Sequence, residues 1–161
     1  SLTSSFQETA YKVRLLAAKD GSAEYHPEPL RHTAPARRPR VCLAPSPVDV
    51  SNPFLYHKTT NRRVYDRALA ARPEYDDVLL WNERGEITES CIANVVIDLN
   101  GELFTPPVRC GLLGGAFRAY LLDRGEIQER VIPVEEIERS SHVYLVNSVR
   151  KQREAFVDPL T

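Results

Sequence analysis

The chain has 161 residues and a mass of 18.2 kDa, which is enough for one sizeable core but cramped for two intact domains. Its 21 basic and 22 acidic side chains give a net charge of −1, so no general field attracts nucleic acid or an acidic membrane. The balanced charge therefore favours a small neutral or anionic partner that is held locally. No segment approaches the roughly 20 consecutive apolar residues of a membrane span.

The N-terminal part of the sequence predicts three β-strands. Residues 10–18 and 22–30 are rich in β-forming residues and are separated by Lys19-Asp20-Gly21, a typical turn sequence. Residues 40–44 form a shorter run of the same kind. These patterns predict a hairpin followed by a third strand.

Prolines are crowded between Arg31 and Pro53, where they forbid regular helix and disfavour interior strands. We therefore predict an interdomain linker at 46–53, which separates residues 1–45 from a larger domain at 54–161. The sequence contains no methionine, even at position 1, which indicates a chain that was processed or excised from a longer one.

Helices and strands are predicted to alternate in the rest of the chain. Val64, Ala68 and Leu69 recur at helical spacing, in a helix that opens at Lys58 and runs towards Ala71. The other predicted elements are strands at 75–82, 90–99, 102–107, 127–134, 142–148 and 154–157, a tight hairpin at 100–101, and helices at 116–125 and 135–140. This alternation favours an α/β or α+β fold with mixed sheets and flanking helices.

Lys58 is the first candidate for chemistry. The chain has four lysines against seventeen arginines, and a cation needed only for solubility would more often be arginine. Partial burial beside Phe54, Leu55 and Tyr56 would lower the pKa of this amine and make it a nucleophile. A solvated lysine near a helix start is the alternative interpretation.

Two further motifs carry possible chemistry. Glu89, just before an apolar strand, is either a solvated turn residue or the partner of a buried cation or protonated heterocycle. Gly114 and Gly115 precede a helix, so they either form a flexible turn or leave its first N–H groups open to a phosphate. Together, an activated amine, an isolated carboxylate and a phosphate site match the needs of pyridoxal 5′-phosphate (PLP).

The chain also resembles the class IV aminotransferase family, the fold-type IV PLP enzymes that include branched-chain and D-amino acid aminotransferases and aminodeoxychorismate lyase. The matching runs, within residues 53–161, are HKTTNRRVYDRA, GEITESCIANVVID, GELFTPPVRCGLLGGAFRAYLL and VYLVNS. HKTTNR and VNS look most like the lyase, in the form fused behind para-aminobenzoate synthase component I. The resemblance implies a D-amino acid aminotransferase-like fold in which residues 1–45 are the remnant of a small N-terminal domain.

The resemblance also implies a role for each matching residue. Lys58 would be the Schiff-base lysine and proton shuttle, and Glu89 the partner of the pyridine nitrogen. The cofactor phosphate would be held by Gly115, Ala116, Phe117, Asn147 and Ser148. The implied reaction forms 4-aminobenzoate and pyruvate from 4-amino-4-deoxychorismate in folate biosynthesis. The alternatives are a class IV amino acid aminotransferase, which would use the same lysine and acid, and a non-catalytic module. The resemblance also implies a homodimer.

The sequence departs from the family pattern at several points. Phe117 replaces a threonine, Arg63 replaces a tyrosine, and the segment that carries a phosphate-binding arginine has no counterpart before Ser1, so part of the site is expected to be missing. No metal site is predicted, because the histidines lack ligand spacing. Three widely spaced cysteines predict a reducing, cytoplasmic location without a disulfide framework. The histidines are His26, His32, His57 and His142.

Overall fold

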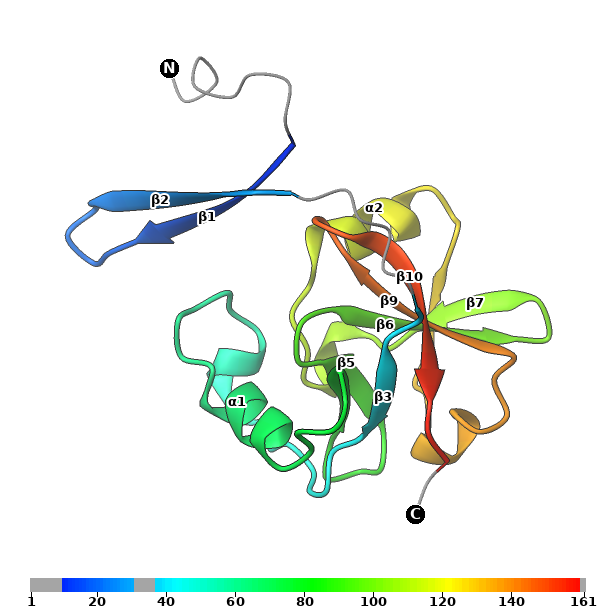
Figure 1. The fold of residues 1–161 in the computed structure, drawn as a ribbon. Helices are drawn as coiled ribbons and strands as arrows, with labels where there is room; N and C mark the ends of the chain where they lie inside the picture. The colour runs from blue at the N-terminus through cyan, green and yellow to red at the C-terminus, as the bar shows by residue number, and fades with distance from the viewer. Residues whose placement is uncertain (1–9, 31–36, 160–161) are drawn as a thin grey trace. The chain divides into compact units, whose positions relative to one another are not determined.

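The computed structural model describes residues 10–30 and 37–159, and the chain divides into two compact units between residues 36 and 37 (Figure 1). In the first unit, β1 (Tyr11–Ala17) pairs with β2 (Ala23–Pro29) as an antiparallel hairpin. The turn between them places Gly21 at a φ of 85°, a left-handed conformation that glycine adopts without strain. The predicted hairpin is confirmed.

The second unit is a mixed sheet with flanking helices. Its helices are α1 (Arg63–Ala70) and α2 (Ala116–Asp123), and single 3₁₀ turns occupy Pro53–Leu55, Val108–Cys110 and Val134–Glu136. Its strands are β3 (Arg40–Leu43), β4 (Asp77–Trp81), β5 (Ile87–Ser90), β6 (Asn94–Leu99), β7 (Glu102–Thr105), β8 (Gln128–Glu129), β9 (His142–Asn147) and β10 (Lys151–Val157). The predicted combination of mixed sheets and flanking helices is therefore confirmed.

The sheet closes on itself through six of its strands. The strand order is β5-β4-β3-β10-β9-β6-β7-β8, and an additional pairing of β5 with β6 completes a ring from which β7 and β8 extend. β3 runs parallel to both β4 and β10, whereas β5, β6 and β9 pair antiparallel with their neighbours. Because β5 and β6 are consecutive, closure requires a tight connection between them.

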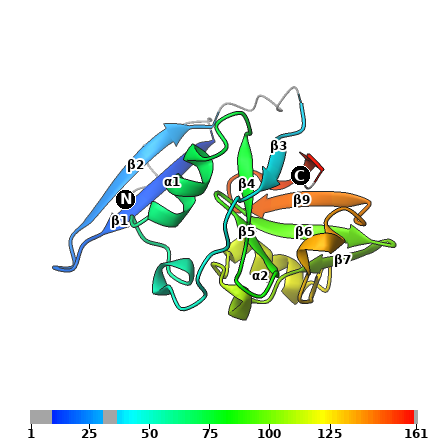
Figure 2. The ribbon, with the colours of Figure 1, turned by 90° about the horizontal axis from the view of Figure 1, so that it is seen from below.

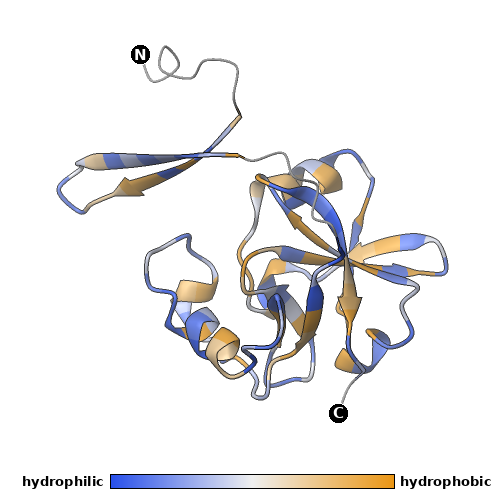
Figure 3. Ribbon diagram, viewed as in Figure 1, coloured by the Kyte–Doolittle hydropathy of each residue, from blue (hydrophilic) through white to orange (hydrophobic). Residues whose placement is uncertain are grey.

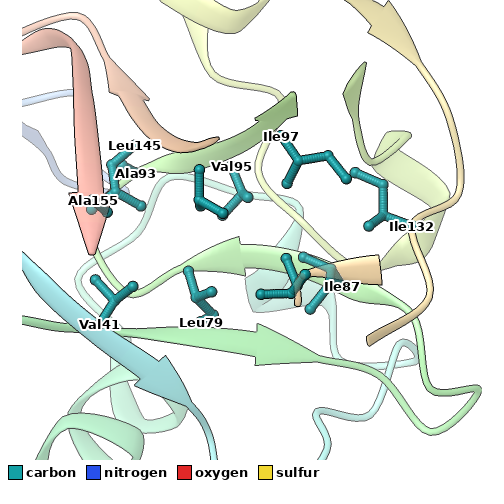
Figure 4. Packing of buried hydrophobic residues seen from close by; sticks show 11 residues of the cluster. Val41, Leu79, Ile87, Ala93, Val95, Ile97, Ile132, Leu145 and Ala155 are labelled. Atoms are coloured by element: carbon teal, nitrogen blue, oxygen red, sulfur yellow. The ribbon is translucent and has the colours of Figure 1, made fainter. Parts of the chain in front are cut away.

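The main core lies inside this ring (Figure 4). Val41, Leu79 and Ile87, on β3, β4 and β5, lie opposite Val95 and Ile97 of β6. All five side chains are fully buried. Alternate residues of a strand point to opposite faces, so the intervening residues must be covered from outside.

Each helix covers part of the outer face, with α1 beside β4 and α2 on the side of β6 and β9 (Figure 2). Tyr65 and Ala68 of α1 pack with the outward-facing Val78 and Leu80 of β4. Hydrophobic and hydrophilic residues both occur along α1 (Figure 3), as expected for a helix with one packed face. The apolar residues of the strands therefore contribute to two packed layers, one inside the ring and one under the helices.

The segment after residue 36 belongs to the second unit, so the predicted boundary at 45 differs from the observed division. β3 pairs with β4 and β10, and Val48 is buried and donates its backbone N–H to the Trp81 carbonyl at 2.8 Å. The predicted linker at 46–53 is therefore attached to the sheet at Val48. The interpretation of the first unit as a domain remnant stays a prediction.

Several predicted elements are shorter than expected. The strand predicted at 90–99 is shortened to β6 at Asn94–Leu99, because Ser90 ends β5 and residues 91–93 form the connection that lets β5 pair with β6. The helix predicted to open at Lys58 begins at Arg63, and the strand at 127–134 is reduced to the two residues of β8. The predicted acidic helix at 135–140 is only the 3₁₀ turn at Val134–Glu136.

Three further observations bear on the predicted class of protein. Cys42, Cys91 and Cys110 are free and buried. Within the described ranges, no helix is long and apolar enough to cross a membrane. The same ranges contain no group of three or more histidine, cysteine, aspartate or glutamate residues that could hold a metal ion.

Candidate active site

Glu89 is a carboxylate built into the sheet. It lies on β5 and is only 4% exposed, so the interpretation as a solvated turn residue is wrong. The Tyr65 hydroxyl donates a hydrogen bond of 2.7 Å to Glu89 Oε1, and Asn94 Nδ2 lies 3.4 Å from Oε2. Burial raises the pKa of Glu89 to about 7, although the hydrogen bond from Tyr65 and the charges of Lys58 and Arg62 act in the opposite direction.

Asn94 connects this acid to the start of α2. Its Nδ2 also donates to the Leu113 carbonyl at 2.7 Å, two residues before the helix N-cap Gly115. A Cβ atom at Gly115 would lie 2.1 Å from Asn94 Oδ1, a distance that no side chain could accept without a shift. Glycine is therefore required at position 115, since the helix start and the amide of Asn94 approach so closely.

The beginning of α2 has an open set of backbone donors. Gly115 is an N-cap without a side-chain hydrogen bond, and the first residues that follow it are Ala116 and Phe117. These two residues and Ser148 line a hollow of about 360 Å³, together with Tyr120 and Lys151. Three of the residues predicted to hold a phosphate are thus brought together by the fold.

The register of the sheet relates the acid to β9, the strand that leads to Ser148. Glu89 pairs with Asn94, and Asn94 pairs with Val146, so the three residues form one row across β5, β6 and β9. Two strand spacings correspond to about 10 Å, a length suited to a pyridine ring with a phosphate arm. Asn147 Oδ1 accepts hydrogen bonds from the N–H groups of Val149 and Arg150, which holds the turn that carries Ser148.

Lys58 lies in the segment before α1, and its side chain is exposed. Phe54 and Leu55 do not enclose Lys58 in the way that the first interpretation requires. Leu55 packs into the cluster under α1, and Phe54 is 42% exposed. Tyr56 instead donates its hydroxyl to the Val50 carbonyl at 2.8 Å. Lys58 is close enough to Glu89 for its charge to lower the pKa of that acid, but it does not line the hollow at α2.

These residues fit PLP in two respects. A pyridine nitrogen that carries a proton requires a buried acceptor, and Glu89 is a buried carboxylate with a second oxygen whose contact is long. A phosphate requires close approach to backbone N–H groups, and the absence of a Cβ at Gly115 permits that approach. The phosphate-binding arginine expected from the family has no assigned position among these residues.

Tyr65, Arg62 and Asn94 are site residues that were not predicted from the sequence. Arg62 Nη2 donates to the Cys91 carbonyl at 2.7 Å, and its guanidinium lies 4.8 Å from the centroid of the Tyr65 ring. Asn94 could have been found, because an amide inside the apolar run that precedes Val95 must have buried partners. Tyr65 carried no such signal, since an aromatic residue on a helix face is ordinarily part of the core.

Comparison with known proteins adds a family to this geometry. The family model described as "Amino-transferase class IV" matches residues 4–154. A curated protein of Schizosaccharomyces pombe, described as "Putative aminodeoxychorismate lyase", is 37% identical over 107 residues. That match covers 62% of this chain and 46% of the relative, so the chain spans about half the length of that relative.

Solved structures resemble the chain over more of its length. A structure described as a putative amino-acid aminotransferase from Mesorhizobium loti has a TM-score of 0.88 and 36% identity, and covers 94% of this chain and 74% of its own. A structure described as a putative 4-amino-4-deoxychorismate lyase from Legionella pneumophila has a TM-score of 0.71 and 25% identity, with coverage of 84% and 53%.

Proposed function

Because the chain belongs to the class IV aminotransferase family, we propose that it is the PLP-binding part of a lyase that converts 4-amino-4-deoxychorismate to 4-aminobenzoate and pyruvate. The observation that carries this proposal is the buried carboxylate of Glu89, which Asn94 connects to the start of α2. The choice of the lyase is supported by the HKTTNR and VNS motifs and by the name of the curated relative. In this proposal the lyase acts as a homodimer.

The residues of the proposed site would divide the chemistry between them. PLP, when bound, supplies a ring that accepts the electrons of a breaking C–H bond. Lys58 would hold the cofactor through its amine and would move the α-proton of the substrate, which requires Nζ to turn from solvent into the site. Glu89 would hold the proton on the ring nitrogen, because its negative charge stabilises that cation in a site with little water.

The start of α2 has the task of binding the phosphate. The unpaired backbone N–H groups at Ala116 and Phe117 and the positive end of the helix dipole favour an anion there. Phe117 contributes only its backbone, and Ser148, which also lines the hollow, contributes a hydroxyl. The close packing of Gly115 on Asn94 fixes the distance between this phosphate and Glu89.

Transamination of an amino acid is the second candidate function. The Mesorhizobium loti structure, whose description is that of an amino-acid aminotransferase, matches 94% of this chain, a larger share than the lyase from Legionella pneumophila. Lys58 and Glu89 would have the same tasks in both reactions. The difference lies in the substrate and in whether the amino group is returned to a keto acid.

A product assay separates the two functions. The chain, and any longer protein that contains it, is mixed with PLP and either 4-amino-4-deoxychorismate or an amino acid with 2-oxoglutarate. We expect pyruvate from the first mixture, its loss in Lys58→Ala, and no change in Lys19→Ala, a control in the hairpin turn. Glutamate formation without pyruvate would favour the aminotransferase, and failure of every such protein to bind PLP would favour a non-catalytic module.

A further inference from the structure

The side chain of Tyr65 is hydrogen-bonded to the central carboxylate of the candidate active site. Its hydroxyl donates the 2.7 Å hydrogen bond to Glu89 Oε1, while its ring is 8% exposed and packs in the cluster that α1 forms with β4. The guanidinium of Arg62 covers one face of the ring. The packing therefore fixes the direction in which the phenol donates.

The contact determines how Glu89 is presented. Oε1 is engaged by the phenol, whereas Oε2 has the longer contact of 3.4 Å with Asn94. A carboxylate with one oxygen held in this way keeps its plane and its remaining lone pairs in a defined orientation. The 3.4 Å contact with Asn94 constrains the group less than the 2.7 Å hydrogen bond from Tyr65 does.

The charged and titratable groups around Glu89 come from three segments. Tyr65 and Arg62 lie on α1 and at its N-cap, Lys58 lies before the helix, and Cys91 follows β5. The hydrogen bond from Tyr65 lowers the pKa of Glu89, against the effect of burial, and is a larger cause than the charge of either Lys58 or Arg62. The burial of Tyr65 itself, followed by the charge of Glu89 and the hydrogen bond to it, raises the pKa of Tyr65, so the phenol stays a donor.

We propose that Tyr65 is a positioning residue, which orients the Glu89 carboxylate towards the cofactor and keeps it ionised so that it can hold the protonated ring nitrogen. This inference rests on the proposed function. Tyr65 itself touches neither substrate nor cofactor in the proposal. Its effect is transmitted through Glu89 alone, and it should therefore alter cofactor affinity and pH dependence together.

The test compares two tyrosines with the same kind of hydrogen bond. Tyr65→Phe removes the donor to Glu89, and the matched control Tyr75→Phe removes a 2.7 Å hydrogen bond to Asp158 elsewhere in the same unit. We expect Tyr65→Phe to weaken PLP binding about tenfold and to shift the pH dependence of the absorption of bound PLP, because a hydrogen bond to a charged group is lost. Tyr75→Phe should leave both unchanged.

A fluorinated tyrosine at position 65 covers the case in which Tyr65→Phe does not fold. It keeps the shape of the ring but is a stronger donor, so the pH at which the absorption changes should move in the opposite direction. Normal PLP binding at Lys58 in the unaltered protein, with no shift in either Tyr65 variant, would overturn this inference alone. Absence of PLP at Lys58 in the unaltered protein would overturn the proposed function and this inference with it.

Discussion

Replacement of Gly115 by alanine tests the connection between Asn94 and the start of α2. The added Cβ would lie 2.1 Å from Asn94 Oδ1, well inside van der Waals contact, and Asn94 cannot swing aside without losing its 2.7 Å hydrogen bond to the Leu113 carbonyl. Overpacking of this kind costs about 1–3 kcal/mol, and the lost hydrogen bond costs about 1 kcal/mol more. We expect Gly115→Ala to lower the free energy of unfolding by about 2–4 kcal/mol.

The neighbouring glycine provides the control. A Cβ at Gly114 would lie 3.7 Å from Val108 Cγ2, an ordinary contact, so Gly114→Ala should change stability by less than about 1 kcal/mol. Urea unfolding followed by circular dichroism measures both variants, and a PLP titration should find weaker binding only in Gly115→Ala. Equal unfolding free energies for the two variants would refute the proposed close contact.

Two further predictions concern buried charges. Burial raises the pKa of Glu89 from 4.5 to about 7, so the folded protein binds an extra proton between these values and its stability should fall as the pH rises through that window. The fall in the free energy of unfolding is at most about 3 kcal/mol and is measured by urea unfolding at about pH 5 and about pH 8. Glu89→Gln should abolish it, and an unchanged pH dependence in this variant would contradict the raised pKa of Glu89. Arg118 is 3% exposed and donates to the Pro106 carbonyl at 2.8 Å and to Glu129 at 2.5 Å. Arg118→Met should therefore lower the free energy of unfolding by about 1–3 kcal/mol, measured by thermal unfolding. The control Arg130→Met, at an exposed ion pair, should lower it by less than about 1 kcal/mol, and similar losses in the two variants would contradict the role of burial.

The elements that the sequence predicted well are those with a strong local signal. The hairpin of β1 and β2 and the turn at Asn100-Gly101 follow from turn residues, and both residues of the latter have a positive φ. The helix after Gly115 follows from its glycine start. In these cases the preference of a few neighbouring residues decides the local structure.

The errors arise where distant packing overrides the local pattern. The apolar run at 90–99 reads as one strand, but closure of the ring makes residues 91–93 a connection between β5 and β6. The prolines before Pro53 suggested a linker, although Val48 pairs with Asn82 and is buried. A pairing between segments far apart in the chain is not visible in either segment alone.

The candidate site could be predicted in its chemistry but not in its connections. The sequence identified Glu89 and the start of α2, because an isolated acid and a glycine pair are recognisable residue types. It did not identify Tyr65 and Asn94, which connect these groups only after β5, β6 and α1 have packed together. It left Lys58 either partly buried beside apolar side chains or solvated; the 3₁₀ turn at Pro53–Leu55 directs Leu55 into the core, and Lys58 is exposed.

Identification of the lysine that binds PLP is the most direct test of the proposed site. The chain, and any longer protein that contains it, is incubated with PLP and reduced with borohydride, and the labelled peptide is identified by mass spectrometry. We predict labelling at Lys58, with a loss of label in Glu89→Gln and in Gly115→Ala. Labelling at Lys12, Lys19 or Lys151 in its place would contradict the proposed site.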